Sequence, residues 1–328
     1  MDNMIDLIPY TEELYNQWNE LVSTSCNGTL FHRLDFLGYH KDKFTRNIHN
    51  LVWLKKGSVF AVLPMQIING DEGIEAVSPY GASFGGIVTG KPLNYSESCR
   101  LADTFMDFLK GKKVKRVSMV LPPVIYDEEA SETLIFALLE RGFSLTASDI
   151  TSAVPLCTNN SRVTRFRTKE KDLIRKSKRT QRLNVVIREN APVDDFWHVV
   201  KLNFDKHNTS PTHTITEWSY LCEKFPDLFC NWVAYLNEKP IAGIGQIKVK
   251  KDITLAFYLC SDPEYYYLQA LTSLLYSAML DARSKGARWY DLGTSSYNMH
   301  GRQNIFQFKE SFGALGFLRR KLKFSDSL

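Results

Sequence analysis

The stretch Ile253-Thr-Leu-Ala-Phe-Tyr-Leu259 decides the fold, together with the helical pattern of residues 264–284 and the segment Ala287-Arg-Trp-Tyr-Asp-Leu292 that follow it. The two outer segments are rich in β-branched and aromatic residues, as strands are, and the helical pattern between them ends at Gly286. A strand that is reached through a crossover helix normally lies parallel to its neighbour. We therefore expect a parallel pair of strands in this part of the chain.

The segments before this stretch repeat an order that is also found in the first half. Strand-like runs at 232–236 and 241–249 come before it, and both are separated by turn residues, which predicts an antiparallel meander. The first half has strand-like runs at 51–54, 59–65 and 73–79, a helix at about 96–109, a strand at 115–121 and a helix at about 131–141. This order predicts an α/β (α+β) fold of two related halves, each a mixed, largely antiparallel sheet flanked by helices. We expect the domains to be residues 1–160 and 161–328, which suits a chain of 328 residues.

Composition excludes several classes of protein. With 44% hydrophobic and 23% charged residues the chain is that of an ordinary globular protein. Residues 1–9 carry Asp2 and Asp6 where a secretory signal has basic residues, and no apolar run is long enough to cross a bilayer, so we expect a cytoplasmic protein without membrane insertion. The six cysteines form no CxxC pair, which favours reduced thiols and predicts no metal site.

Positive charge is concentrated in one segment. Residues 162–188 contain eleven Lys or Arg against two acidic residues, a charge of +9, so the rest of a chain of net charge +5 carries −4. This distribution favours a compact anion as the partner rather than a long polyanion. Nucleic acid is the rival partner, but it favours aromatic residues among the cations, and only Phe166 is present.

Three motifs of the second half resemble one family. They are the basic stretch 172–188, Trp289-Tyr-Asp-Leu-Gly293 and Phe308-Lys-Glu-Ser-Phe-Gly313, and the first half adds Pro79-Tyr-Gly-Ala-Ser-Phe-Gly-Gly86. Together with the element order they resemble tandem proteins of the GNAT acyltransferase superfamily, of the kind seen in Fem peptidoglycan ligases and related bacterial acyltransferases. The resemblance implies transfer of an acyl group to an amine, with acyl-CoA as co-substrate.

One stretch departs from the family pattern. The usual acetyl-CoA signature places a Gln or Arg and two glycines before the helix, so that backbone N–H groups contact the pyrophosphate. Here that stretch is Ser261-Asp-Pro-Glu-Tyr-Tyr-Tyr-Leu-Gln-Ala270, without glycine. Some relatives take the acyl group from tRNA, so both donors remain open.

The resemblance places the acyl thioester where two neighbouring strands splay, with its carbonyl polarised by a backbone N–H. Backbone groups of Tyr258, Leu259 and Cys260 are the expected contacts for the oxyanion and the pantetheine, and Leu268 and Gln269 at the helix start are further cofactor contacts. The Tyr258 hydroxyl is a candidate for protonating the leaving thiolate, or it fills a strand face.

The polar segment 203–213 supplies the candidate base. His207 is the best candidate because an unperturbed histidine titrates near pH ~6.5, and Asp205 is placed to orient it, although such residues also cap helix ends. The spacing of His207 and His213 suggests a metal, but no acidic or cysteine ligands accompany them, so we predict none.

Further residues are substrate-binding candidates. Lys309 stands at the Phe-Lys position that lines the active site in the resembling ligases, so it is both a substrate-binding and a catalytic candidate. Asp291 is expected either to bind a hydroxyl or amine of the substrate or to pair with a nearby arginine. Arg175, Lys178 and Arg179, with Arg182, recur at helical spacing that suits a diphosphate or a solvated face. Tyr80 is a candidate stacking platform for a base or sugar. The nearby segment 85–91 approaches a P-loop, but Pro92 replaces the Ser or Thr that holds magnesium.

These observations predict an N-acyltransferase that moves a short acyl group from acyl-CoA to the amine of a nucleotide-linked amino sugar, such as a dTDP-amino-dideoxyhexose, in bacterial glycan or O-antigen synthesis. The alternatives are a Fem-like ligase that uses aminoacyl-tRNA on a peptidoglycan precursor, and a binding protein that keeps the GNAT fold without catalysis.

Overall fold

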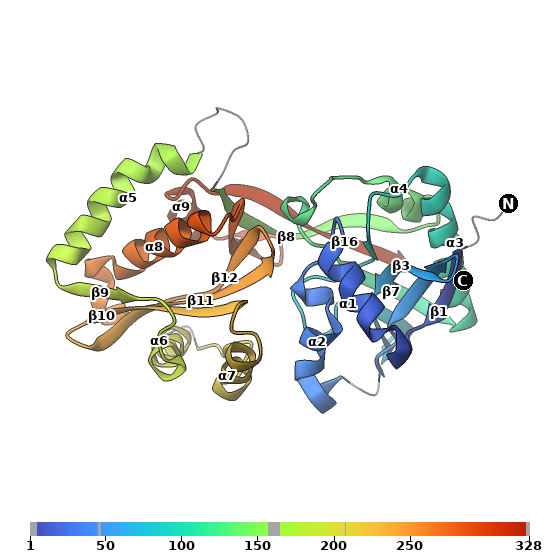
Figure 1. The fold of residues 1–328 in the computed structure, drawn as a ribbon, viewed down its shortest axis with the longest axis horizontal. Coiled ribbons are helices and arrows are strands. Elements are labelled where there is room, and N and C mark those ends of the chain that lie inside the picture. The colour runs from blue at the N-terminus through green and yellow to red at the C-terminus, as the bar shows by residue number, and fades with distance from the viewer. Residues whose placement is uncertain (1–4, 45–46, 157–164, 207, 326–328) are drawn as a thin grey trace. The chain divides into compact units, whose positions relative to one another are not determined.

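Residues 5–44, 47–156, 165–206 and 208–325 are described by a computed structural model, in which the chain divides into two units (Figure 1). Unit 1 consists of Met1–Ile150 and Phe317–Leu328, and unit 2 of Thr151–Gly316. This division differs from the predicted boundary between residues 160 and 161. The last strand, β16 (Leu315–Ser325), pairs with a strand of the first half, in register Lys321 with Val120, which the local sequence did not indicate.

Unit 1 contains two sheets. A four-stranded sheet has the order β1-β2-β3-β6, and a second sheet has the order β4-β5-β7-β16-β8. The parallel pair in unit 1 joins β5 to β7 and is reached through helix α3. The bounds of the strands are β1 (Ile5–Pro9), β2 (Leu51–Lys55), β3 (Ser58–Leu63), β4 (Gln66–Gly70), β5 (Gly73–Ser78), β6 (Val88–Thr89), β7 (Val114–Val120) and β8 (Ser144–Pro155), and those of the helices are α1 (Tyr15–Thr24), α2 (Leu34–Leu37), α3 (Tyr95–Gly111) and α4 (Thr133–Leu139).

The predicted three-strand meander of the first half is wrong. The predicted strand 59–65 ends before Pro64 as β3 of the first sheet, while β4, which was not predicted, begins at Gln66 and forms a hairpin with β5 in the second sheet. Proline has no N–H to donate to a strand ladder, which explains why the chain leaves one sheet at this residue and enters another.

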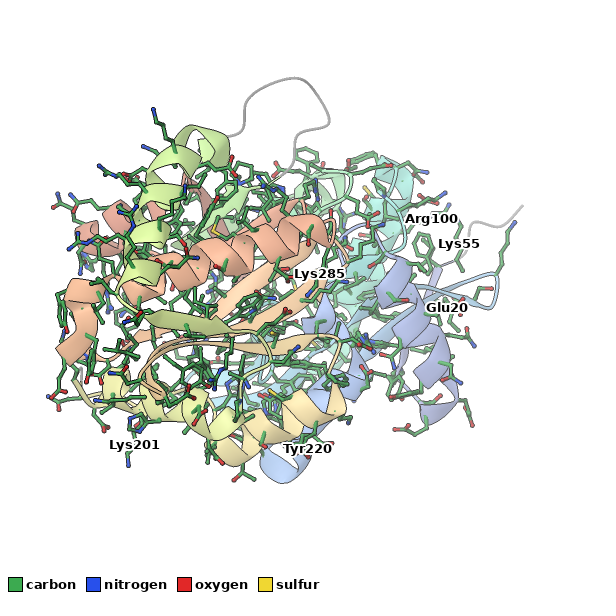
Figure 2. The ribbon with its side chains drawn as sticks, turned by 60° about the vertical axis from the view of Figure 1, so that its left-hand side comes forward. Glu20, Lys55, Arg100, Lys201, Tyr220 and Lys285 are labelled. Carbon is green, nitrogen blue, oxygen red and sulfur yellow. The ribbon has the colours of Figure 1, made fainter. Side chains whose placement is uncertain are left out.

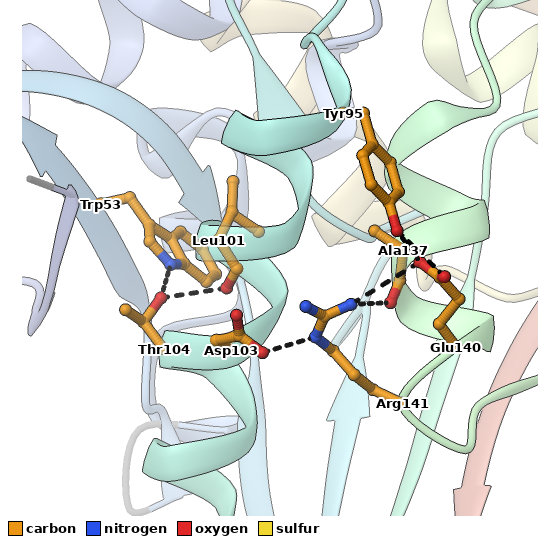
Figure 3. Close-up of polar contacts among 8 residues, drawn as sticks. All are labelled: Trp53, Tyr95, Leu101, Asp103, Thr104, Ala137, Glu140 and Arg141. Atoms are coloured by element: carbon orange, nitrogen blue, oxygen red, sulfur yellow. Dashed lines mark hydrogen bonds and ion pairs between the residues drawn. The ribbon is translucent and has the colours of Figure 1, made fainter. Parts of the chain in front are cut away.

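Helices α3 and α4 of unit 1 are joined by polar contacts (Figure 3). Asp103 on α3 accepts a hydrogen bond of 2.7 Å from Arg141 Nε, and Arg141 also donates to the carbonyl oxygen of Ala137 at 2.7 Å. Tyr95 at the start of α3 donates to Glu140 at 2.9 Å. These contacts hold the two helices against each other.

Unit 2 contains the predicted mixed sheet, with the order β8-β13-β12-β11-β10-β9. β10, β11 and β12 form the antiparallel meander, and β12 and β13 form the parallel pair, which confirms the expected fold class. The strands are β9 (Val185–Arg188), β10 (Phe229–Leu236), β11 (Lys239–Lys250), β12 (Ile253–Ser261), β13 (Trp289–Thr294), β14 (Ser296–Tyr297) and β15 (His300–Gly301), and the helices are α5 (Arg165–Arg182), α6 (Val193–Lys206), α7 (Ile215–Lys224), η6 (Pro263–Leu268), α8 (Ala270–Ser284) and α9 (Gln303–Glu310).

Helices cover both faces of this sheet. α5 and α8 lie on one face, and α6 and α7 on the other (Figure 1). Glycine allows the close approach on the second face, because a Cβ on Gly245 would lie 2.8 Å from the rings of both Phe196 and Trp218. The aromatic side chains of α6 and α7 therefore lie directly on the backbone of β11.

The predicted helix 264–284 is in fact two helices. The 3-10 helix η6 ends before Gln269, which has a φ of 53°, and α8 begins at Ala270. A left-handed residue breaks the helical hydrogen-bond pattern. The segment that replaces the family's glycine-rich stretch is thus a separate turn of helix that carries three tyrosines.

Candidate functional site

The parallel pair of unit 2 is short. Its register pairs Ile253 with Trp289 and ends where Leu255 pairs with Asp291, although β12 continues to Ser261. On the other side of β12 the register with β11 shifts between Ala256 and Tyr258, so that Phe257 forms a β-bulge. A bulge bends the strand that carries it. The two strands therefore separate beyond Leu255.

A cavity of about 640 Å³ lies where these strands separate. Its walls come from β12 and β13, from the first turn of α8, from α9, and from single residues of α5 and α6 on opposite faces of the sheet. It is lined by Lys176, Asn203, Ala256, Phe257, Leu259, Ser261, Tyr266, Gln269, Ala270, Leu271, Thr272, Leu292, Gly293, Thr294, Asn304, Ile305, Phe308, Lys309 and Ser311. About half of these residues are apolar and the others carry hydrogen-bonding groups, a combination that suits a small molecule with both polar and apolar parts.

Lys309 is the buried cation of this cavity. Its side chain projects from α9, the residue is 4% exposed, and Nζ donates to the carbonyl oxygens of Gly293 at 2.8 Å and Thr294 at 2.6 Å. Burial lowers the pKa of Lys309 to about 8, against the opposing effect of the Asp291 carboxylate. The amine therefore titrates close to neutral pH and lies at the end of β13.

Asp291 is fully buried beside it. Its Oδ1 accepts hydrogen bonds from the Thr151 hydroxyl at 2.6 Å and from the Gly293 N–H at 2.8 Å. These bonds hold the turn at Gly293, whose φ is 73°, and so direct the two carbonyl groups that Lys309 contacts. Asp291 thus accepts hydrogen bonds from two uncharged donors, and its two predicted roles, binding a substrate group or pairing with an arginine, stay predictions.

Helix α5 is attached to the start of α8 by buried hydroxyl groups. Ser273 Oγ donates to Thr180 Oγ1 at 2.8 Å, and Thr180 Oγ1 lies 3.2 Å from the carbonyl oxygen of Leu268. This contact places Lys176, one turn earlier on α5, in the cavity wall, where it pairs with Asp172 at 3.0 Å.

The three predicted diphosphate ligands on α5 are all exposed. At about 100° per residue, Arg175 and Lys178 fall on the side opposite to the buried stripe of Leu173, Ser177 and Thr180, and Arg175 pairs with Asp172. Arg179 lies on the flank that also carries Lys176. The buried hydroxyl residues of this helix were the signal that could have identified Lys176, because they mark the face that turns toward the cavity.

Tyr258 does not line the cavity. Its hydroxyl lies 3.0 Å from His213 Nδ1 and accepts a bond of 3.1 Å from the His213 N–H, within an aromatic cluster that includes Phe196 and Trp218. Burial raises the pKa of Tyr258 to about 12. In this position the hydroxyl does not reach the cavity in which a thiolate would lie.

Of the other predicted cofactor contacts, two line the cavity and two do not. Leu259 and Gln269 line the cavity. Cys260 is buried and burial raises the pKa of its thiol to about 12, while Leu268 packs in the core of unit 2. The sequence did not indicate Asn203 or Phe257, since a β-bulge and the position of a helix residue over it depend on packing.

Two candidates lie elsewhere in the chain. Asp205 is exposed near the end of α6, and His207, which it was predicted to orient, lies outside the described residues. Tyr80 belongs to unit 1, is 3% exposed, and donates a hydrogen bond of 3.1 Å to Asn50. A stacking platform needs an accessible ring, so this prediction for Tyr80 is contradicted.

In unit 1 the parallel pair β5–β7 corresponds to β12–β13, but the loop around Gly85 and Gly86 fills the space at the end of the pair. Beyond the β5–β7 pair, the Gly85 N–H donates to the carbonyl oxygen of Val120 at 2.8 Å, and the Gly86 N–H donates to the Ser78 hydroxyl at 2.9 Å. The cavity that Gly85 lines has a volume of only about 80 Å³. The glycines permit this close approach of backbone, because a Cβ on Gly85 would lie 2.6 Å from the nitrogen of Pro79.

Within the described parts of the chain, no group of three His, Cys, Asp or Glu side chains is placed to bind a metal ion. A search of the same residues for helices of sufficient length and apolar character to span a bilayer gave none.

Solved structures with the same fold cover nearly the whole chain. FemX is 12% identical with a TM-score of 0.69, and the match covers 98% of this chain and 97% of that chain. The C-terminal domain of a putative lysylphosphatidylglycerol synthetase from Agrobacterium fabrum is 15% identical with a TM-score of 0.62, covering 95% and 91%. A tandem GNAT protein from the clavulanic acid biosynthesis pathway is 9% identical with a TM-score of 0.54, covering 98% of both chains. No family model and no curated protein matches the sequence. The chain thus has the tandem GNAT-like fold.

Proposed function

We propose that the protein is an N-acyltransferase that transfers a short acyl group from acyl-CoA to the amine of a nucleotide-linked amino sugar. The observation that carries the proposal is the separation of β12 and β13 beyond Leu255, which opens a cavity between two strands of one sheet. A pantetheine chain is long and narrow and carries amide groups, so a passage between two strands with both apolar and hydrogen-bonding residues in its wall fits it.

The reaction needs a donor for the developing oxyanion and a group that compensates negative charge. The amine attacks the thioester carbonyl, a C–N bond forms, and the C–S bond breaks to release the thiolate. Beyond Leu255, β12 stays paired with β11 but no longer pairs with β13, so the backbone N–H groups on the β13 side are the proposed donors to the oxyanion. Lys309, held by two carbonyl groups at the end of the same cavity, supplies positive charge to the intermediate or a proton to the thiolate.

The start of α8 supports an anionic donor. Residues Gln269–Thr272 line the cavity, and the N-terminus of a helix carries a partial positive charge, although the N–H groups of Gln269 and Thr272 already donate to the carbonyl oxygens of Tyr266 and Gln269. Lys176 stands in the same wall, and Arg179 lies one turn further along the same flank of α5. For the acceptor, these cations and the exposed arginines of α5 suit the diphosphate of a nucleotide sugar. His207 remains the proposed base for the attacking amine.

The direct test combines purified protein with a panel of acyl-CoAs and nucleotide-linked amino sugars and measures release of the CoA thiol. We expect turnover in the wild type and a loss of roughly 100-fold or more in kcat for Lys309→Met, the order of magnitude for an electrostatic group in an acyl-transfer site. Lys201→Met replaces an exposed lysine of α6 (Figure 2) and serves as the matched control. Absence of thiol release across the panel would overturn the proposal.

A Fem-like ligase is the second candidate function. Two observations favour it, namely the TM-score of 0.69 to FemX and the segment 263–268, where a 3-10 helix with three tyrosines replaces the glycines that contact a pyrophosphate. Transfer from aminoacyl-tRNA to a peptidoglycan precursor, without binding of CoA by calorimetry, would establish this function. Binding of either donor without turnover on any acceptor would instead support a non-catalytic protein.

A further inference from the structure

Three consecutive tyrosines lie in one turn of helix at the rim of the cavity, which Tyr266 lines. Tyr265, Tyr266 and Tyr267 belong to η6, which connects β12 to α8. Tyr266 lines the cavity and is 45% exposed, and Tyr267 is 67% exposed. Large aromatic side chains that stay exposed beside a cavity have apolar faces available to a ligand.

Lysines accompany two of these rings. Lys206 Nζ lies 4.4 Å from the ring centroid of Tyr266 and donates to its hydroxyl at 3.2 Å. Lys239 Nζ lies 4.5 Å from the centroid of Tyr265, whose ring is stacked at 6.5 Å on that of Tyr267. Lys206 lies on α6, one turn after Asn203 in the cavity wall. An aromatic face and an ammonium group therefore occur together on both sides of the rim.

Aromatic faces next to cations are the usual means of binding a nucleotide, because the base stacks on the ring and the phosphate is attracted by the ammonium group. Acidic side chains in η6 and before it make a bare diphosphate a poor ligand for this turn. Asp262 is buried and accepts a bond of 3.0 Å from the Glu264 N–H, and both carboxylates face Lys239 at 3.4 and 3.7 Å. The turn thus favours the base end of a nucleotide over its phosphates.

We propose that η6 is a purine-binding subsite in which the adenine of the acyl donor stacks on Tyr266, while Lys206 and Lys176 contact its phosphates. The inference rests on the proposed function, in which the cavity holds the acyl group. An adenosine phosphate is the part shared by the two candidate donors, since it forms one end of CoA and the 3′ end of tRNA. Stacking would replace the backbone contacts that the missing glycines would have provided.

Binding tests the subsite without catalysis. The probes are CoA, adenosine 3′,5′-bisphosphate, pantetheine, and an RNA hairpin that ends in CCA, each titrated by calorimetry. We expect the wild type to bind adenosine 3′,5′-bisphosphate and also one of the two donor probes, CoA or the RNA, when each is titrated separately. Tyr266→Leu should raise the Kd of these adenosine-containing probes roughly tenfold, as expected for loss of one stacking contact. Tyr266→Phe, which keeps the ring, should stay within about twofold of the wild type. Tyr297→Leu is the control, because Tyr297 is 63% exposed in β14 and lies outside the cavity wall.

The RNA and CoA arms distinguish the source of the adenosine, and the pantetheine arm separates this inference from the proposed function. Pantetheine lacks the purine, so its binding or its acyl transfer should be unchanged in Tyr266→Leu. If no probe that contains adenosine binds, or if Tyr266→Leu weakens pantetheine as much as the full donor, the subsite is refuted even where acyl transfer occurs. If adenosine binding depends on Tyr266 but no acyl group is transferred, the subsite stands and the proposed function fails.

Discussion

The strongest prediction concerns the charge on Lys309 and the stability of unit 2. This lysine is almost completely buried, and burial lowers its pKa from 10.5 to about 8. Below pH 8 the folded and unfolded states both carry the proton, so Lys309 adds no pH dependence there. Between pH 8 and 10.5 the unfolded state keeps a proton that the folded state has lost. The free energy of unfolding must therefore rise with pH in this window.

The size of the effect follows from the two pKa values. The complete difference between 10.5 and about 8 corresponds to roughly 3 kcal/mol. Between about pH 7 and about pH 9.5 the expected rise in the free energy of unfolding is roughly 2 kcal/mol. Replacing Lys309 by methionine removes the titrating group while keeping an unbranched side chain of similar length, so this part of the pH dependence should disappear.

The assay is urea denaturation of the wild type, Lys309→Met and Lys201→Met across that range of pH. Tyrosine and cysteine groups that also titrate at high pH are common to all three proteins, so the comparison uses the difference between wild type and variant at each pH. We expect this difference to change by roughly 2 kcal/mol for Lys309→Met and to stay constant for the exposed Lys201. A difference for Lys309→Met that is constant within about 0.5 kcal/mol would refute the reasoning, because the buried amine would then hold its proton as firmly as a lysine in water.

Three further outcomes are expected. If the protonated Lys309 supports acyl transfer, the kcat of the wild type should fall as pH rises through about 8. The pH-rate profile of Lys309→Met should lack this decline. The same decline in both proteins would contradict a catalytic role of the Lys309 charge. Asp291→Asn should lower the pKa of Lys309 further, because the carboxylate opposes the effect of burial, so stability should begin to rise at a lower pH in the same denaturation assay; an unchanged onset would show that the two groups do not interact. Gly245→Ala should destabilise unit 2 by about 1–3 kcal/mol in thermal or urea unfolding, since its Cβ would lie 2.8 Å from two aromatic rings. The control is Gly111→Ala, where no atom lies within 4 Å of the added Cβ. This variant should be neutral or slightly more stable than the wild type.

The sequence identified those residues of the candidate site that a motif or a position at the end of an element marks. Lys309 was identified through the Phe-Lys pair of a motif, and Leu259 and Gln269 through their places at the end of a strand and the start of a helix. The face on which Tyr258 lies could not be decided from the sequence, because alternation along a strand fails at the bulge formed by Phe257. Tyr80 was expected to be accessible in a glycine-rich loop, but those glycines allow the loop to pack on its own strands. Neither outcome depends on local sequence.

The sequence by itself determined the type and order of most elements of unit 2, since hydrophobic periodicity and turn residues act over a few neighbouring positions. It was sufficient for the mixed sheet of unit 2 and its parallel pair, and it placed the excess positive charge on one helix. Tertiary structure alone decided that β16 joins unit 1 and that β12 and β13 separate beyond Leu255. Strand partners, bulges and the orientation of a helix depend on contacts between segments far apart in the chain, and these contacts leave no periodic signal in either segment alone.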